Sequence, residues 1–316
     1  MSVAVDIVSG FLGSGKTSVL RHVLAGGLRG TRVAVVMNEI GEVGIDSHVL
    51  TGLGAIEKLV ELSNGCICCS IDEHRFDVAV QDLLDTVRPD LIVIETSGVA
   101  DPGTLAARIQ GAGLRVDAVI TVVDASAARR WLRETAVARR QIEAADFLVV
   151  NKTDLVTSPE LATLGRRLRR LNRRAALAHA CHGQVDLPLL FGPEVGGYRR
   201  PAAAGGEPPP QDGHLRADRI GAFVYRTERR LERERFERAV ATFPRDVFRA
   251  KGMIRFAGHD GPWLFNYTCG RSDLGFVRLP GGSSASQVVL IGREPARYRD
   301  RVLRALGRCE VRDAAT

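Results

Sequence analysis

The stretch Gly10-Phe11-Leu12-Gly13-Ser14-Gly15-Lys16-Thr17 decides how the beginning of this chain folds. An apolar segment, residues 3–8, precedes it and a helical pattern of apolar residues follows it, which gives the order strand, glycine-rich loop, helix. The glycines allow backbone N–H groups to surround phosphate oxygens, with the positive end of the helix facing the anion. The pattern predicts a P-loop that binds a nucleoside triphosphate.

Individual residues of this loop have separate expected roles. We expect the Lys16 ammonium to reach the β- and γ-phosphates and the Thr17 hydroxyl to bind Mg²⁺, and we count both residues as catalytic. The residues expected to contact the nucleotide along this stretch are Gly10, Gly13, Ser14, Gly15, Lys16, Thr17 and Ser18.

A second motif bears on the base of the nucleotide. The segment 146–150 reads as a buried strand and leads into Asn151-Lys152-Thr153-Asp154, and Asn-Lys-x-Asp at such a position is the guanine-recognition element of GTPases. The Asp154 carboxylate can accept from the ring N–H and the exocyclic amine of guanine, whereas adenine offers no such pair of donors. We expect Lys152 to pack its stem over the base and Asn151 to tie the loop together. The motif predicts GTP.

A further loop should complete the base site. Residues 180–183, Ala-Cys-His-Gly, follow a short apolar segment at a position where a backbone N–H usually reaches the guanine carbonyl. Cys181 itself is an isolated cysteine, like Cys269 and Cys309, and we expect all three to be ordinary buried or partly exposed thiols.

A third motif places a carboxylate near the phosphates. The apolar strand 91–94 ends at Glu95, and Gly98 follows three residues later. We expect Glu95, which we also count as catalytic, to reach the Mg²⁺ shell through water and the Gly98 N–H to contact the γ-phosphate. Most signalling GTPases carry Asp-x-x-Gly here, so the glutamate is a departure. A solvated glutamate is the alternative, but the apolar run before it favours a functional role. Asp124, at the end of another apolar strand, is a weaker candidate.

Three cysteines lie within four residues in the segment Asn64-Gly65-Cys66-Ile67-Cys68-Cys69. No signal peptide suggests an oxidising compartment, so disulfides are disfavoured. Thiolates at this density favour Zn²⁺, with Cu(I) or Co²⁺ possible. Three thiolates leave one tetrahedral position open, which suits a transferable metal, and the candidate fourth ligands are Glu39, Glu42 and His74. Thiols packed in a core and a redox-sensing cluster are the open alternatives.

An acidic loop lies between the P-loop and the cysteines. An apolar strand leads into residues 38–46, where Glu39 and Glu42 alternate with glycines. A loop in that position can reach Mg²⁺ and the γ-phosphate and so behave as a switch, although its carboxylates could equally be solvated. We hypothesise that Mg·GTP orders this loop beside the cysteines, and that hydrolysis releases the metal to a client protein. Intrinsic hydrolysis should be slow, because no catalytic glutamine or arginine finger is readable.

Together these motifs resemble the CobW-type GTPases, relatives of the HypB and UreG metal-insertion GTPases. The resemblance is dense over the first two hundred residues and looser over the last hundred. It implies a GTP-dependent metallochaperone, most often for zinc and in some members for cobalt or a nitrile hydratase metal. By this resemblance, Cys66, Cys68 and Cys69 match the metal-binding motif of the family. Many members carry a His-rich linker, whereas here His214 stands alone, which argues against metal storage.

Two other classes of function compete with this one. The first is a regulatory GTPase with structural or redox cysteines, and the second is a basic module that uses GTP as a timer on nucleic acid. The net charge is +7, from 44 basic and 37 acidic residues, and arginines cluster over residues 166–174. Aromatic content is only 5%, with no visible stacking platform, so solvated helix faces are preferred over a nucleic-acid surface. Neither rival explains three clustered thiols beside a switch loop.

The order of the predicted elements indicates an α/β fold of the P-loop NTPase type. Strand and helix alternate to about residue 195, which predicts a mostly parallel sheet covered on both faces, with its ligand at the carboxyl ends of the strands. The strands predicted for this part are residues 3–8, 32–37, 91–95, 118–123 and 147–150. We place a GTPase domain at 1–195, a Gly- and Pro-rich linker at 196–217, and a smaller α+β domain at 218–316.

Within the second domain, apolar runs predict antiparallel strands at 220–225, 253–256, 263–267 and 288–291. No apolar run of the chain approaches the roughly 20 residues that a bilayer-spanning helix needs. The first apolar segment leads into the P-loop and is therefore a strand, not a signal peptide. We expect a cytoplasmic protein without a membrane partner.

Overall fold

The computed structural model describes residues 3–26, 32–38, 56–62, 73–185, 190, 220–276 and 285–311. These residues divide into two compact units. One unit holds the described residues up to Leu190, and the other holds those from Ile220 onward. None of the helices among the described residues is long and apolar enough to cross a membrane.

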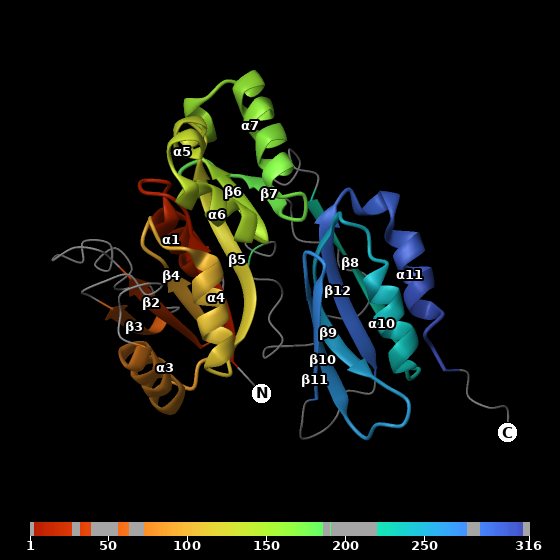
Figure 1. The fold of residues 1–316 in the computed structure, drawn as a ribbon. Coiled ribbons are helices and arrows are strands. Elements are labelled where there is room, and N and C mark those ends of the chain that lie inside the picture. The colour runs from red at the N-terminus through yellow and green to blue at the C-terminus, as the bar shows by residue number, and fades with distance from the viewer. Residues whose placement is uncertain are drawn as a thin grey trace, which may run out of the picture. The chain divides into compact units, whose positions relative to one another are not determined.

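The first unit is built on a seven-stranded sheet in which every pairing is parallel (Figure 1). Its strands are β1 (Ala4–Ser9), β2 (Val33–Asn38), β3 (Ile56–Leu62), β4 (Leu91–Glu95), β5 (Arg115–Asp124), β6 (Phe147–Asn151) and β7 (Ala176–His179). Their order across the sheet is β3-β2-β4-β1-β5-β6-β7. The predicted α/β fold class is confirmed. The edge strands β3 and β7 were not predicted, because charged residues interrupt the apolar run of β3 and β7 has only four residues.

Seven helical segments connect these strands within the described residues. They are α1 (Lys16–Gly26), α3 (Glu73–Thr86), α4 (Pro102–Gly111), α5 (Ala128–Glu134), α6 (Ala136–Ala144), the 3₁₀ turn η1 (Thr153–Leu155) and α7 (Ser158–Leu171). Every residue of β4 and of β6 is buried. Because successive side chains of a strand point to opposite faces, both faces of the sheet are covered at these strands.

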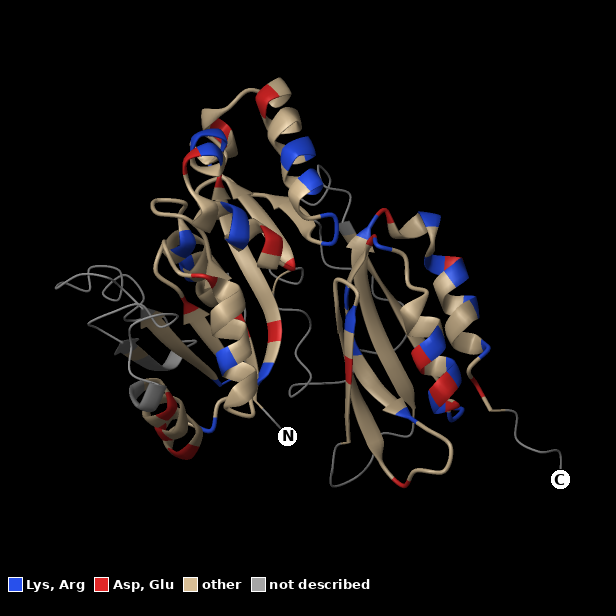
Figure 2. Ribbon diagram, in the orientation of Figure 1, with Lys and Arg blue, Asp and Glu red and all other residues tan. Residues whose placement is uncertain are grey.

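Two apolar clusters hold the helices on the sheet. In the first, Phe76 and Leu83 of α3 and Leu105 of α4 pack against β1, β2 and β4. In the second, residues of α5, α6 and α7 pack against β5, β6 and β7. Helix α7 buries Leu164 and Leu168 and turns its arginines toward solvent, as the blue residues in Figure 2 show. This is the pattern of an amphipathic surface helix.

The register of the parallel strands determines which residues meet at the carboxyl edge of the sheet. Val8, near the end of β1, pairs with Glu95, the last residue of β4. Asp124 ends β5 and pairs with Asn151, the last residue of β6. The P-loop follows β1 directly. The P-loop, the motif that begins at Glu95 and the motif that begins at Asn151 therefore all start from the same edge of the sheet.

The second unit is a five-stranded antiparallel sheet with helices. Its elements are β8 (Ile220–Thr227), α10 (Arg233–Ala241), β9 (Val247–Arg255), β10 (Pro262–Thr268), β11 (Arg271–Phe276), β12 (Ser286–Arg293), the 3₁₀ turn η2 (Pro295–Arg297) and α11 (Arg299–Gly307). The strand order is β11-β10-β9-β12-β8. The α+β expectation is met, but β9 begins six residues earlier than predicted and β11, a polar edge strand, was missed.

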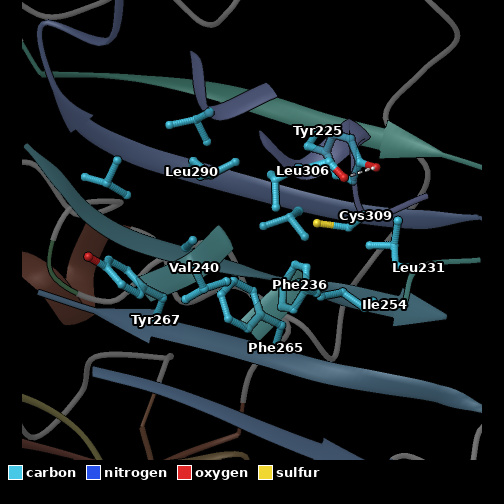
Figure 3. Close-up of a cluster of buried hydrophobic side chains, with 14 of the residues drawn as sticks. Tyr225, Leu231, Phe236, Val240, Ile254, Phe265, Tyr267, Leu290, Leu306 and Cys309 are labelled. Atoms are coloured by element: carbon cyan, nitrogen blue, oxygen red, sulfur yellow. Dashed lines mark hydrogen bonds between the residues drawn. The ribbon is translucent and has the colours of Figure 1, made fainter. Parts of the chain in front are cut away.

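The core of this unit lies between the sheet and its two helices (Figure 3). Phe236 of α10 meets Phe265 of β10 edge to face, with ring centroids 4.9 Å apart. The Tyr225 hydroxyl oxygen lies within hydrogen-bond distance of two acceptors, the Leu306 carbonyl at 3.3 Å and Glu310 Oε1 at 3.1 Å. Aromatic packing of this kind adds to the apolar area removed from water and fixes the helices on the sheet.

Candidate functional site

The P-loop bends through backbone conformations that favour glycine. Gly10 has a φ of +143°, and a Cβ there would lie 2.3 Å from the Val122 carbonyl oxygen. Gly15 has a φ of +94°, and its Cβ would lie 2.5 Å from Asn151 Nδ2. Gly13 also has a positive φ, +70°, but has open space beside it. A side chain at Gly10 or Gly15 would displace a neighbour, so these two glycines are required for the close approach of the loop to β5 and β6.

Hydrogen bonds within the P-loop hold it in a closed turn, and helix α1 begins where the loop ends. The Ser14 N–H donates to the Phe11 carbonyl at 3.1 Å, and the Val19 N–H donates to the Gly15 carbonyl at 3.0 Å. Lys16, the first residue of α1, donates through Nζ to the Gly10 carbonyl at 3.1 Å. The ammonium of Lys16 therefore lies over the loop that is predicted to hold phosphates.

Thr17 and Glu95 meet although 78 residues separate them. The Thr17 hydroxyl donates to Glu95 Oε1 at 2.8 Å. Glu95 is buried, with 5% of its surface exposed, so its carboxylate is held at this edge and not solvated. Two hard oxygen ligands side by side suit a divalent cation such as Mg²⁺. The structure thus brings together the two residues that the sequence placed near magnesium.

The loop after β4 packs directly on the P-loop. A Cβ on Gly98 would lie 2.8 Å from the backbone nitrogen of Leu12, so only glycine fits there without a shift. Gln141 of α6 supports this loop, because its Nε2 donates to the carbonyls of Gly98 and Ala100 at 3.2 and 3.0 Å. Sequence analysis missed Gln141, since nothing in α6 marks one buried amide as a partner of a loop 40 residues earlier.

Asn151 joins the predicted base-recognition motif to two other loops. Its Nδ2 donates to the Ser14 carbonyl of the P-loop at 3.1 Å, and its Oδ1 accepts from the Gly183 N–H at 3.0 Å. The residue is almost completely buried. Gly183 in turn lies against α1, where its Cβ would come within 2.7 Å of the Ser18 backbone. Ser18, predicted to contact nucleotide, is thus placed beside the 180–183 loop.

Lys152 and Asp124 form an ion pair at the same edge. The Lys152 Nζ lies 2.7 Å from Asp124 Oδ2, and Lys152 itself has a left-handed φ of 60°. Burial acts to raise the pKa of Asp124, but hydrogen bonds from Lys152 and Ser126 outweigh it and hold this pKa below its usual value. Asp124, a weaker candidate in the sequence, is therefore the ionised group that fixes the lysine of the motif.

We expect Asp124→Asn to weaken GDP binding about tenfold. The change removes the charge that positions Lys152, and a hydrogen bond to a charged group contributes about 1.5–3 kcal/mol, reduced here because Lys152 is partly exposed. Titration with a fluorescent GDP analogue measures the effect. Asp90→Asn is the matched control, because Asp90 pairs with Arg32 before β2 and β4, at the amino ends of the strands. An equal loss of GDP affinity in both variants would contradict the role assigned to Asp124.

Asp154, predicted to bind the base, is exposed on η1. The Cys181 thiol donates to Asp154 Oδ1 at 3.1 Å, and this hydrogen bond lowers the pKa of Asp154. The same contact raises the pKa of Cys181. Cys181 was expected to be an unremarkable thiol. It instead lies beside the carboxylate of the predicted base motif, because β6 and β7 are neighbouring parallel strands.

The predicted transition-metal ligands lie outside the described residues. They are Cys66, Cys68, Cys69, Glu39 and Glu42, together with the side chain of the alternative ligand His74. Their placement relative to the P-loop stays a prediction.

Comparison with known protein families matches each of the two units to a family model. Residues 4–179 match the model of the CobW/HypB/UreG nucleotide-binding domain, and residues 220–310 match that of the cobalamin synthesis protein cobW C-terminal domain. The zinc chaperone YjiA of Escherichia coli strain K12 is 37% identical over 199 residues, which cover 60% of this chain and 61% of that protein. The zinc-regulated GTPase metalloprotein activator 1 of Schizosaccharomyces pombe is 36% identical over 194 residues, which cover 58% of this chain.

The match spans only 47% of the length of the yeast protein and 61% of that of YjiA. Among solved structures, Zn(II)-bound YjiA GTPase from E. coli aligns with 98% of this chain and 100% of its own, at 26% identity and a TM-score of 0.47. Because the first family model matches more than half of the 316 residues, the chain belongs to the CobW/HypB/UreG family.

Proposed function

We propose that this protein is a GTP-binding and GTP-hydrolysing metallochaperone that carries a transition metal, with zinc favoured, to a client metalloprotein. Cys66, Cys68 and Cys69 hold the metal in this proposal, and Glu39 or Glu42 supplies a further ligand. The relatives named as zinc chaperones and as a zinc-regulated GTPase support it. Free thiolates of this kind suit a reduced compartment such as the cytoplasm.

One observation carries the nucleotide half of the proposal: Asn151 bridges the P-loop and the 180–183 loop through Ser14 and Gly183. This bridge links the predicted phosphate site to the predicted base site by two hydrogen bonds. A nucleotide spanning the two would contact Lys16 at its phosphates and Asp154 at its base. Guanine satisfies the Asp154 carboxylate with two donors, and adenine does not.

The residues at the phosphate end fit magnesium. Thr17 and Glu95 offer adjacent hard oxygens, and the glycine loop leaves room for phosphate oxygens that a Cβ at Gly10 would remove. Bound Mg²⁺ would neutralise charge that develops on the phosphates during transfer. The chain's own part is to hold the γ-phosphate between Lys16 and the Gly98 backbone.

The register of the sheet supports a link between nucleotide and metal. Met37 of β2 pairs with Glu95, and Asn38 at the end of β2 pairs with Leu62 at the end of β3. The acidic loop follows β2 in the chain and the cysteine segment follows β3, so both begin at the edge that carries Glu95. We infer that GTP at this edge orders the acidic loop and tightens metal binding, and that hydrolysis relaxes it.

The second unit completes the proposed organisation. We propose a GTPase domain at 1–195, a linker at 196–217 and a C-terminal domain at 218–316 that docks a partner or senses the nucleotide state. The two family matches, which end at residue 179 and begin at residue 220, support this division.

The metal-binding part of the proposed function is tested by measuring the affinity for zinc in two nucleotide states. Titration against a competing chelator, with a non-hydrolysable GTP analogue and with GDP, should give affinities that differ at least about fivefold, the lower end of ordinary allosteric coupling. By linkage, zinc should tighten binding of the analogue by the same factor. Equal zinc affinity in both states would remove the chaperone mechanism and leave a regulatory GTPase with structural or redox cysteines.

Metal identity needs its own measurement. Metal analysis of protein purified anaerobically with Mg·GTP should find zinc, and cobalt in its place would point to the cobalt or nitrile hydratase branch. GTP hydrolysis should exceed ATP hydrolysis and be slow without metal or partner.

A further inference from the structure

Three metal-ligating side chains gather at the base end of the site. Asp154, Cys181 and His182 each offer one ligand atom, and these atoms lie within 4.8 Å of one another. In the described ranges this is the single such group of three or more His, Cys, Asp or Glu residues. It is separate in sequence from the Cys66–Cys69 segment, and it lies on the loops after β6 and β7.

Backbone contacts fix the two loops that carry this group. The Ala180 N–H donates to the Val150 carbonyl at 2.8 Å, which continues the pairing of β6 with β7. The backbone N–H and the hydroxyl of Thr153 both donate to the Ala180 carbonyl, at 3.2 and 3.0 Å. Asp154 directly follows Thr153 and Cys181 directly follows Ala180, so the ligands start from a preformed frame.

The turn at His182 is fixed as well. The Gln184 N–H donates to the Cys181 carbonyl at 2.9 Å, and Gly183 is held by Asn151 and packs on α1. His182 has a left-handed φ of 51°, a conformation that a non-glycine residue adopts at some cost. Its imidazole and the neighbouring thiol thus leave the same tight turn.

The donor set has the chemistry of a borderline metal. Thiolate, imidazole and carboxylate are the ligands of Zn²⁺ and Co²⁺, and three of them leave a fourth position for water. The Cys181 proton lies between the sulfur and the Asp154 carboxylate. A bound metal replaces that proton, which is released to solvent. Cys181 and His182 are at least partly accessible, so a metal from solution can reach them.

We propose that Asp154, Cys181 and His182 form a second transition-metal site, whose occupation competes with guanine for Asp154. The competition rests on the proposed function, because it requires Asp154 to be the base-recognition carboxylate. When one oxygen of the Asp154 carboxylate binds the metal beside Cys181, the carboxylate no longer presents both of its oxygens to the guanine base. Metal in excess then lowers the affinity for GTP, which is opposite in sign to the coupling proposed for the Cys66–Cys69 site.

Cobalt spectroscopy tests the site itself. The variant Cys66→Ser/Cys68→Ser/Cys69→Ser of the full chain removes the other thiolate cluster and is titrated with Co²⁺ under a non-thiol reductant. We expect one equivalent to give a thiolate-to-cobalt charge-transfer band. Adding Cys181→Ser should abolish the band, and adding His182→Ala should weaken Co²⁺ binding at least tenfold. The matched control Cys269→Ser removes a buried thiol and should leave the band intact. No band, or a band that survives Cys181→Ser, overturns the proposal.

Nucleotide competition tests the coupling. GDP and ADP chelate metal through the same diphosphate, so a difference between them reports the base alone. GDP should displace Co²⁺ at a concentration at least tenfold lower than ADP, and equal displacement overturns the competition. GDP binding is also measured with a chelator and no metal. Failure of GDP to bind there would sink the proposed guanine site, whereas the cobalt band through Cys181 would stand.

Discussion

Replacing Lys16 by alanine is expected to lower the affinity for GTP and GDP roughly 1000-fold. The ammonium lies over the P-loop, 3.1 Å from the Gly10 carbonyl, where the phosphates are predicted to bind. Charge-assisted hydrogen bonds contribute about 1.5–3 kcal/mol each, and Lys16 would make them to two phosphates. The variant Lys16→Arg should recover little of the lost nucleotide affinity, because a planar guanidinium does not replace a compact ammonium in a closed loop. Isothermal titration with each nucleotide measures the loss.

A control within the same helix separates charge from structure. Arg21 lies on the exposed side of α1, so Arg21→Ala removes the same charge without touching the loop. We expect it to bind GTP as the parent does. Circular dichroism melts of both variants should agree within a few degrees, since neither side chain belongs to the core. Parent-like GTP affinity in Lys16→Ala would show that the glycine loop does not bind phosphate.

The second large effect is a change of base specificity. Asp154→Asn should weaken GTP binding roughly 100- to 1000-fold and create binding of xanthosine triphosphate. An amide accepts from the ring N–H but turns an NH₂ toward the exocyclic amine of guanine, whereas xanthine carries an oxygen at that position. The lost pairing leaves two N–H donors facing each other without an acceptor, which lowers the affinity for guanine.

This prediction contains its own control. A misfolded variant would lose every nucleotide, so a gain of xanthine nucleotide binding cannot arise from damage to the fold. Competition of GTP, ATP and xanthosine triphosphate against one fluorescent probe gives all three affinities. Retained guanine preference in Asp154→Asn would move base recognition away from η1 and would also remove the basis for metal competition at this residue.

Local sequence patterns were sufficient to recognise a motif whose residues are consecutive in the chain. The P-loop needs its glycines at fixed spacing between a strand and a helix, and both the spacing and the flanking apolar pattern are readable. The sequence predicted that Thr17 and Glu95 lie near one Mg²⁺, because the P-loop follows one apolar strand of the predicted parallel sheet and Glu95 ends another. Their direct hydrogen bond is seen only in the structure. Strands β3, β7 and β11 were missed, and each lies at an edge of its sheet. Charged or polar residues interrupt the apolar pattern of β3 and β11, and β7 has only four residues.

The sequence by itself determined the α/β fold class, the phosphate loop, the base motif and the family. Only the tertiary structure decided that Asp124 holds Lys152, that Gln141 supports the Gly98 loop, and that Cys181 lies against Asp154. Those contacts depend on which strands are neighbours and on their register. Neither is encoded in a local window, because both follow from how the whole sheet packs against its helices.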